Sequence, residues 1–359
     1  MVGFANDFVR RVRKRMKTTP ILSMSKDSGN VRVGHFASQN MYLPLVRDLQ
    51  SRNISGTVGI LTQTNEEAVI LLALLRSRGI GATLMQSSDV FRFSTLAEVR
   101  YFMRIIERNT TSPMISDTTW REAKSKTFGK YASSTTLPYL KRCIEVFEKT
   151  SKQMYYTDFK EFMHESELDD FCDLNGSSIT ISTIHKSKGL EFDEVYMLVA
   201  GNFAENDDQL RRYYVGLTRA KKDLYIYTNG HSFDGRSQFA THYYDVEDYP
   251  LPDEVVLQLT HRDVSLGFFT SRKEMVLSLV GGDLLECHEE YLCLPGTRRH
   301  VARFSAKMLE TIKLWNERGY VISSASVRFV VAWRPKDAPA DEPETAVLLP
   351  ELTLERVSS

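Results

Sequence analysis

The stretch Thr183–Leu198, TIHKSKGLEFDEVYML, carries the most chemically informative residues of the chain. The alternating segment SSITISTI predicts a strand that delivers Thr183, and EVYMLVA predicts the next strand. The polar residues between them therefore form a loop at a strand end, where α/β sheets bind ligands. Hydroxyl, imidazole and ammonium groups there suit phosphate oxygens or a nucleic-acid backbone, and Gly189 permits a backbone conformation that a Cβ would hinder. From composition alone, a solvated loop without function remains an equal alternative.

A second segment, RRYYVGLTRAKKDLYIYT, begins at Arg211 and predicts a helix over 208–220 that is followed by a strand. Arg219 falls close to the carboxyl end of that helix. A cation in this position complements the helix dipole. A guanidinium is also the group that stabilises charge on a phosphoryl group during transfer. Both interpretations of Arg219 stand from this segment alone.

The rest of the chain alternates between two kinds of pattern. Strand and helix patterns alternate before residue 90 and again around the two segments, which predicts a parallel α/β sheet. Between them the strands vanish and amphipathic helical stretches dominate, which indicates a helical insert. Beyond residue 235, strands surround one predicted helix. The expected division is 1–90 for the first α/β part, 91–173 for the insert, 174–234 for the second α/β part and 235–359 for a small β-rich module.

Together, the two segments resemble motifs V and VI of the UvrD/Rep-like superfamily 1 DNA helicases. The family patterns read T-h-H-x-[SA]-K-G-L-E-F and R-R-x-x-Y-V-[GA]-h-T-R-A, and residues 183–192 and 211–220 match them nearly position for position. The segment GILTQTN resembles the family's L-x-R-[TS]-N, with Gln63 where an arginine is common. The resemblance implies the fold of a RecA-like domain, of the P-loop NTPase type, split by a helical insert. By analogy with relatives, the C-terminal module is expected to be a Tudor- or SH3-like barrel.

The resemblance also implies roles for particular residues. Arg219 would be the arginine finger, the catalytic residue that contacts the γ-phosphate of ATP. Tyr213 and Tyr214 are expected to be packing residues, and Lys186 could be an ordinary solvated charge. The implied ATP-binding residues are Gly189, Glu191 and Arg219, and the implied DNA-binding residues are Thr183, His185 and Lys188.

No G-x-x-x-x-G-K-[ST] sequence occurs in the chain, so the phosphate cradle of such enzymes is absent from it. In the family, that cradle belongs to the first RecA-like domain. The expected function is the C-terminal motor half of an ATP-dependent 3′-to-5′ DNA helicase that is inactive alone. ATP and Mg²⁺ would bind only to the intact protein, and the partners would be the N-terminal RecA-like domain and single-stranded DNA at a duplex junction. The C-terminal module could have a protein partner.

A second hypothesis is a non-catalytic module with a helicase-like fold that binds nucleic acid or a protein. A reading frame that continues upstream into a Walker A domain would favour the helicase hypothesis, and a natural start at the first residue would favour the module.

Composition narrows these possibilities. The 359 residues carry 46 basic and 46 acidic side chains, so nucleic-acid binding must come from local basic surface rather than net charge. Four irregularly spaced cysteines are typical of the reducing cytoplasm. No run of 18 apolar residues predicts a membrane span. Cys287, His288, Cys293 and His300 crowd one segment, but their spacing matches no zinc template, so no metal site is expected.

Overall fold

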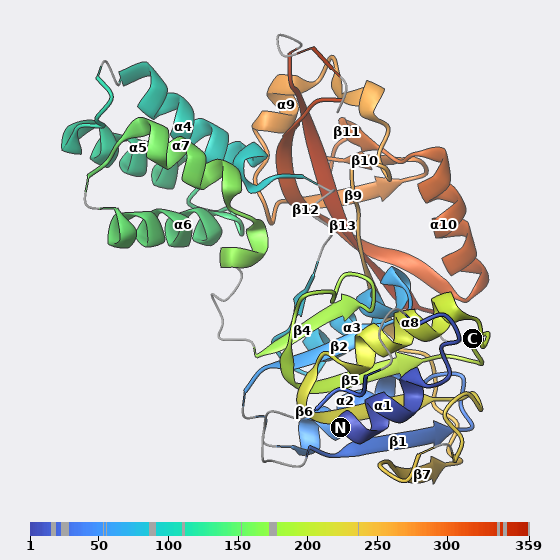
Figure 1. The fold of residues 1–359 in the computed structure, drawn as a ribbon. Coiled ribbons are helices and arrows are strands. Elements are labelled where there is room, and N and C mark those ends of the chain that lie inside the picture. Colours follow the sequence, from blue (N-terminus) through green and yellow to red (C-terminus); the bar gives the residue numbers. More distant parts are fainter. Residues whose placement is uncertain are drawn as a thin grey trace. The chain divides into compact units, whose positions relative to one another are not determined.

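The computed structural model divides the chain into two compact units, Met1–Gln86 with Gly176–Val255, and Ser87–Asn175 with Val256–Ser359. Each unit is described by itself below (Figure 1). The residues that the structure describes are 1–15, 19–22, 29–52, 54, 56–85, 91–109, 112–151, 153–171, 178–235, 237–335, 338–339 and 343–357.

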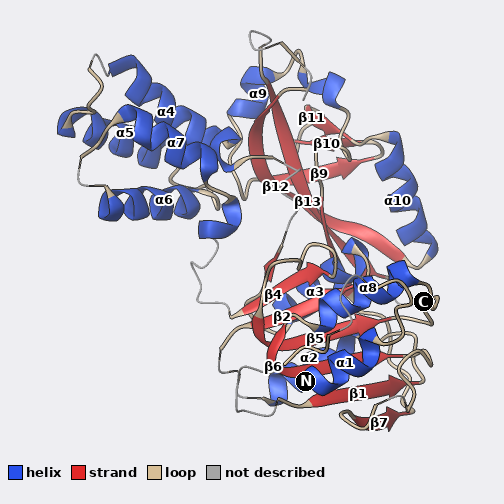
Figure 2. Ribbon diagram, viewed as in Figure 1, coloured by secondary structure: helices blue, strands red, loops and turns tan. Residues whose placement is uncertain are grey.

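A seven-stranded parallel sheet forms the centre of the first unit, with the order β3-β4-β2-β5-β6-β1-β7 (Figure 2). Strand β2 is buried along its whole length, because helices cover both faces of the sheet. The predicted α/β fold, a RecA-like layout split by a helical insert, is confirmed. The strands are β1 (Val31–Phe36), β2 (Val58–Thr62), β3 (Thr83–Leu84), β4 (Ile179–Thr183), β5 (Phe192–Val199), β6 (Ala220–Thr228) and β7 (Thr241–Asp245).

The insert interrupts the sheet between β3 and β4, which are neighbouring parallel strands at one edge. An insertion here leaves the pairing of the inner strands intact, because both of its ends emerge at the same edge strands. The sequence predicted the insert, and the sheet order explains why the fold tolerates it.

Two helices cover each face of the parallel sheet. Helices α2 (Tyr42–Ser51) and α3 (Asn65–Ser77) pack on one face, and α1 (Val2–Val9) and α8 (Asp207–Leu217) pack on the other. Strand β5 serves both cores, because successive side chains of a strand point to opposite faces. Its Val195, Met197 and Val199 join the core under α1 and α8, and its Tyr196 and Leu198 join the core under α2 and α3.

Helix α1 is shorter than the run of apolar residues at near-helical spacing that contains it. Apolar spacing in FANDFVRRVRKRMK suggests a helix to Met16, but α1 ends at Val9, and Met16 lies outside the described residues. The backbone N–H groups of Arg13 and Lys14 instead donate to the carboxylate of Asp207, over 2.9 and 2.8 Å. The carboxylate of Asp207, a residue distant in sequence, therefore takes the place of the backbone carbonyl oxygens that would accept these N–H groups in a longer helix.

The second unit combines the insert with the C-terminal region. The insert contains α4 (Ala97–Asn109), α5 (Asp117–Lys130), α6 (Leu137–Thr150) and α7 (Tyr156–Glu165). These helices enclose an aromatic core in which the Phe159 ring lies 4.9 Å from Trp120 and 4.8 Å from Phe147, measured between ring centroids. Tilted and edge-on rings of this kind attract each other beyond the area they bury.

The C-terminal region forms a curled antiparallel sheet of six strands, in the order β11-β10-β9-β12-β13-β8, with helix α10 (Ala306–Glu317) beside it (Figure 2). The predicted mostly-β character is confirmed. No pairing between the outer strands β11 and β8 is recorded among the described residues, and the likeness to a Tudor or SH3 barrel stays a prediction. The strands are β8 (Glu254–Gln258), β9 (Leu284–His288), β10 (Tyr291–Cys293), β11 (His300–Arg303), β12 (Tyr320–Trp333) and β13 (Thr345–Arg356).

The insert and the C-terminal sheet are in direct contact. Leu96, just before α4, forms an isolated β-bridge with Val331 of β12. The backbone N–H of Thr135 donates to the carbonyl oxygen of Gly281 over 2.9 Å. The sequence placed these two parts in separate domains, and that division, with its boundaries, stays a prediction; in the structure the parts pack into one unit.

No described helix combines the length and the apolar character needed to cross a bilayer.

Asp193 gives the first unit a stability that depends on pH. Its carboxylate accepts the backbone N–H and the hydroxyl of Thr57, over 2.9 and 3.1 Å, and pairs with the Lys222 ammonium at 3.0 Å. These hydrogen bonds to the ionised form lower the pKa of Asp193 to about 2. Because the folded pKa is lowered, Asp193 stabilises the fold above its unfolded pKa of about 3.9 and loses this effect as the pH falls toward 2.

We therefore expect Asp193→Asn to lower the thermal unfolding midpoint at neutral pH and to have a diminishing effect as the pH falls through this window. Asp208→Asn is the matched control, because the Asp208 side chain is 96% exposed and pairs only with Arg211 in the described part of the chain. A difference between wild type and Asp193→Asn that is constant from neutral pH to about pH 3 would contradict the assignment.

Candidate functional site

The loop after β4 runs from one end of the parallel sheet to the other. Thr183 lies beside Thr62 at the carboxyl end of β2, whereas Glu194 of the next strand lies beside Val58 at its amino end. Val58 and Thr62 are four positions apart on β2, which corresponds to about 13 Å along the strand. Residues 184–191 therefore connect the carboxyl ends of the strands to their amino ends.

Local hydrogen bonds fix the path of this loop. The N–H of Ile184 donates to the carbonyl oxygen of Thr62 over 3.0 Å, and the N–H of Ser187 donates to that of Thr183 over 3.1 Å. The buried Ser187 hydroxyl donates to the carbonyl oxygen of Ile184 over 2.8 Å. Gly189 then takes φ of +91°, in the left-handed region that favours glycine. This is the physical reason for a glycine here, and the sequence anticipated it.

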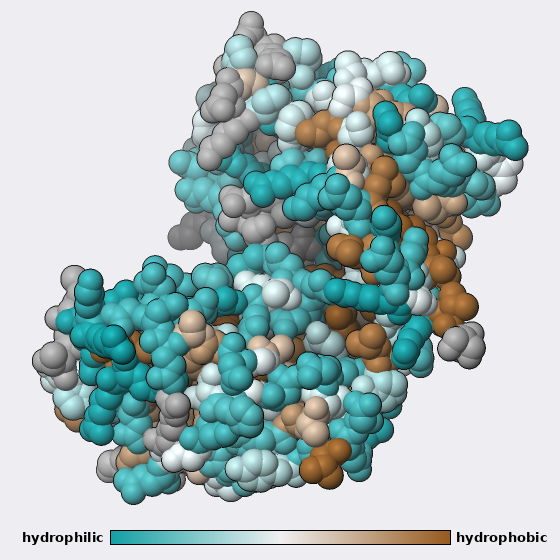
Figure 3. Space-filling model, turned by 90° about the vertical axis from the view of Figure 1, so that its right-hand side faces the viewer, coloured by the Kyte–Doolittle hydropathy of each residue, from teal (hydrophilic) through white to brown (hydrophobic). Residues whose placement is uncertain are grey.

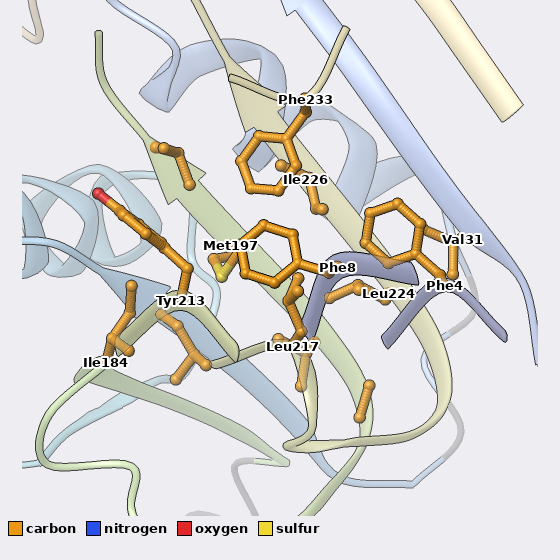
Figure 4. Packing of buried hydrophobic residues seen from close by; sticks show 14 of the residues in the cluster. Phe4, Phe8, Val31, Ile184, Met197, Tyr213, Leu217, Leu224, Ile226 and Phe233 are labelled. Atoms are coloured by element: carbon orange, nitrogen blue, oxygen red, sulfur yellow. The ribbon is translucent and has the colours of Figure 1, made fainter. Parts of the chain in front are cut away.

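The core under α1 and α8 anchors the loop and the helix together. Ile184 of the loop is fully buried, and it belongs to the same hydrophobic cluster as Met197 of β5 and Leu217 of α8 (Figure 4). Gly216 allows this approach, because a Cβ there would lie 2.9 Å from the Met197 sulfur. The loop and α8 are therefore packed into one core.

Arg219 lies at the amino end of the sheet, between α8 and β6. Its Nε donates to the carbonyl oxygen of Val215 over 2.9 Å, its Nη1 to that of Leu190 over 2.8 Å, and its Nη2 to the Thr218 hydroxyl over 3.2 Å. The first contact is the helix-end interaction that the sequence suggested. The second was not predicted, and it joins the guanidinium to the end of the loop.

The six predicted site residues fall into two groups. Gly189, Glu191 and Arg219 lie toward the amino ends of β5 and β6, where Glu191 also pairs with Lys221 at 3.6 Å. Thr183 and His185 lie at the carboxyl end of β4, and Lys188 lies in the loop between the groups. His185 and Lys188 are exposed, whereas Thr183 is only 7% exposed, which limits what its side chain can reach.

The sequence showed only that Gln63 stands where an arginine is common, and its contacts appear in the structure. Its Nε2 donates to the Tyr213 hydroxyl over 2.8 Å and to the carbonyl oxygen of Ala200 over 3.3 Å. Arg212 donates through Nη2 to the Gln63 carbonyl oxygen over 2.7 Å. Gln63 thus ties the ends of β2 and β5 to α8, in place of the charge that an arginine would bring. The packing role expected for Tyr213 holds, since it is 2% exposed.

The helix after β2 begins with a capping box beside Gln63. The Thr64 hydroxyl accepts the N–H of Glu67, and the Glu67 carboxylate accepts the N–H groups of Gln63 and Thr64 over 2.8 and 2.9 Å. Burial raises the pKa of Glu67, against these hydrogen bonds, which lower it. The carboxyl end of β2 is therefore rigidly held at the place where α8 contacts it.

Arg211 forms surface ion pairs and a hydrogen bond near the start of α8. It pairs with Asp207 at 3.4 Å and with Asp208 at 3.2 Å, and its Nη2 donates to the carbonyl oxygen of Lys14 over 2.6 Å. These ion pairs and this hydrogen bond join the start of α8 to the segment that follows α1. They bring the exposed side chains of Arg13 and Lys14 to the start of α8.

The described residues contain no group of three or more histidine, cysteine, aspartate or glutamate side chains arranged to hold a metal ion. Arg219 and Glu191 offer groups suited to the phosphates and the ribose of a nucleotide, respectively.

Residues 115–230 match the family described as UvrD-like helicase C-terminal domain, and this portion of the chain is similar to that family. The match contains both motif segments and the insert from residue 115 onward.

Two relatives agree with this family. A "Probable DNA helicase II homolog" of Rickettsia felis is 35% identical over 126 residues, which cover 29% of this chain and 18% of that protein. A "DNA helicase II" of Rickettsia typhi is 38% identical over 88 residues, which cover 20% of this chain and 13% of that protein. The matched part thus spans less than a fifth of either relative.

A solved structure, the C-terminal domain of a possible DNA helicase from Lactobacillus plantarum, covers 66% of this chain and 94% of its own. Its TM-score is 0.32 at 12% identity, too low a similarity to bear on the fold.

Proposed function

We propose that this chain is the C-terminal motor half of an ATP-dependent DNA helicase that translocates in the 3′-to-5′ direction in the cytoplasm. One observation carries the proposal. The loop 184–191 runs from the strand end at Thr183 to the carbonyl oxygen of Leu190, where Arg219 binds it. The proposed DNA-binding residues at the carboxyl ends of the strands are thereby connected to Arg219 at their amino ends. A helicase needs such a connection, because ATP hydrolysis must be coupled to movement along DNA.

Arg219 is suited to the role of arginine finger. A guanidinium has five N–H groups, and Arg219 uses three of them on Val215, Leu190 and Thr218. The other two have no recorded partner among the described residues. They could bind phosphate oxygens while the three internal bonds hold the side chain in position, so little entropy is lost when the phosphate arrives.

In this proposal, Gly189 and Glu191 complete the ATP side, and an N-terminal RecA-like domain supplies the phosphate cradle. ATP with Mg²⁺ would provide the phosphoryl group for hydrolysis. His185 and Lys188 contact single-stranded DNA directly, and Thr183 contributes mainly through its backbone, because its side chain is buried. Movement of Leu190 with Arg219 would shift the loop and hence His185.

The DNA contacts are tested by titrating fluorescent single-stranded oligonucleotides into the chain at several salt concentrations. We expect affinity to fall with salt and Lys188→Ala to reduce the slope of log K against log salt by about one unit. Lys149→Ala, which removes an exposed charge from α6, is the control and should leave the slope unchanged. An affinity indifferent to salt would refute backbone contacts by this loop.

The second hypothesis, a binding module without hydrolysis, draws support from the surface of the second unit. In the view of Figure 3, hydrophobic side chains gather as a band on the upper part of the molecule. Leu284, Leu314 and Val321 are among the exposed large apolar residues of this unit, with exposures of 68%, 55% and 46%. These exposed residues support a protein partner of the C-terminal region. Because scattered apolar exposure is common on protein surfaces, they are weaker support than the loop geometry that underlies the motor proposal.

A further inference from the structure

A pocket of about 370 Å³ opens on the face of the parallel sheet opposite α8. It lies between α2 and the strands β1, β6 and β7, at the end of the sheet away from β3. None of the residues 183–192 or 211–220 lines it. The pocket is therefore separate from the proposed motor site, and its volume is in the range of small-ligand sites.

The walls of the pocket are aromatic, and one glycine makes room for them. Gly34 of β1 pairs in register with Tyr227 of β6 and Tyr243 of β7, so these positions share one face of the sheet. A Cβ on Gly34 would lie 2.4 Å from the Tyr243 hydroxyl. The Tyr243 ring therefore lies over the glycine, edge-on to Phe36 at 6.0 Å between ring centroids. Tyr225 continues the same wall two residues before Tyr227.

Three arginines border these rings, and one of them is neutralised. Arg52 donates to both oxygens of Asp48, over 2.9 and 3.0 Å, and its guanidinium lies 4.0 Å from the centroid of the Tyr225 ring. Arg32 and Arg47 are exposed, and neither forms an ion pair among the described residues. Arg47 lies 5.6 Å from the centroid of the Tyr249 ring.

The acidic side chains of the pocket are already engaged. Asp48 binds Arg52 and also accepts the Tyr227 hydroxyl over 2.6 Å. Asp245 accepts the Tyr249 hydroxyl over 2.7 Å and the N–H of Glu247 over 2.9 Å. What remains for a ligand is the ring of Tyr243, which is 39% exposed, beside the charges of Arg32 and Arg47. This combination suits a planar group that carries an anion.

We propose that this pocket binds a nucleotide unit, with its base against the exposed ring of Tyr243 and its phosphate on Arg32 and Arg47. Aromatic rings stack on any base, and arginine forks bind phosphate oxygens in pairs. The nucleotide is either a free mononucleotide or one residue of a single strand. This site goes beyond the proposed motor function, because it uses other residues on the opposite face of the sheet.

The test is calorimetric titration of the whole chain with each nucleoside 5′-monophosphate, with the corresponding nucleosides and with inorganic phosphate. We expect a monophosphate to bind more tightly than its nucleoside or phosphate alone. Arg47→Ala should weaken binding about tenfold, the effect of losing one charge-assisted hydrogen bond. Tyr243→Ala should weaken it comparably, whereas Tyr243→Phe should retain most of it because the ring persists.

Two controls keep the test specific. Arg78→Ala removes an exposed arginine at the end of α3, outside the pocket, and Arg219→Ala alters the motor site. Both should bind the monophosphate as the wild type does, so failure of the motor proposal leaves this result untouched. Melting curves establish that each variant is folded, and Arg47→Lys should recover part of the affinity.

Competition with a short single-stranded oligonucleotide then identifies the source. Displacement that weakens in Arg47→Ala indicates a nucleotide within a strand, and absence of displacement indicates a free mononucleotide. The proposal is overturned if no monophosphate binds, or if binding survives both Arg47→Ala and Tyr243→Ala unchanged.

Discussion

Replacement of Arg219 by alanine, in a protein that joins this chain to a phosphate-binding domain, is expected to lower ATP turnover about a thousandfold or more. The two N–H groups that Arg219 leaves free are the donors proposed to stabilise charge on the transferring phosphoryl. Single-stranded DNA binding should persist, because His185 lies at the opposite ends of the strands from Arg219.

Steady-state ATPase assays with and without DNA measure this effect. Arg211→Ala is the matched control, since Arg211 lies on α8, the helix that precedes Arg219, and pairs with Asp207 and Asp208 at the surface. Arg219→Lys separates charge from geometry, because lysine keeps the charge but cannot bridge Val215 and Leu190 with one planar group. Turnover of Arg219→Ala within about tenfold of wild type would exclude the finger role. The chain alone should show no DNA-stimulated turnover, since it has no phosphate cradle.

The second large effect concerns the stability of the second unit. Phe159→Ala is expected to destabilise this unit by about 3–5 kcal/mol, the usual cost of deleting a buried aromatic ring. Phe159 is fully buried, and its ring packs within 4.9 Å of Trp120 and 4.8 Å of Phe147, centroid to centroid. These residues come from three different helices, so the cavity would loosen the whole insert.

Denaturant unfolding followed by tryptophan fluorescence measures this change. Trp120, Trp315 and Trp333 all lie in the second unit, so the signal reports on that unit alone. Lys160→Ala is the control, because Lys160 is the exposed neighbour of Phe159 on α7. If both variants shifted the midpoint equally little, the aromatic cluster would not be the core of the insert.

The local sequence pattern was sufficient to predict features that depend on a single helix, strand or turn. Alternation in SSITISTI located β4, and the helical spacing before Arg219 located α8 to within a few residues. Gly189 was identified as a residue with unusual backbone freedom, and its positive φ agrees. These predictions succeeded because strand and helix periods and glycine's freedom are properties of consecutive residues.

Predictions that depend on distant residues were incomplete. Helix α1 ends early because Asp207, nearly 200 residues away, captures the N–H groups of Arg13 and Lys14. Gln63 was noted only as a missing arginine, and its bond to the Tyr213 hydroxyl could not be read from spacing. The pocket beside α2 was missed entirely, since its walls come from three strands and a helix that meet only in the folded sheet.

The sequence by itself determined that the chain carries helicase motifs V and VI on an α/β frame, because both motifs are continuous segments with fixed spacing. It also determined that Arg219 lies close to the end of a helix and just before a strand. Only the tertiary structure decided that Arg219 binds the carbonyl oxygen of Leu190, at the far end of the loop that leaves Thr183. That contact exists because parallel pairing brings the amino ends of β5 and β6 together, and pairing between strands is not encoded in the period of either.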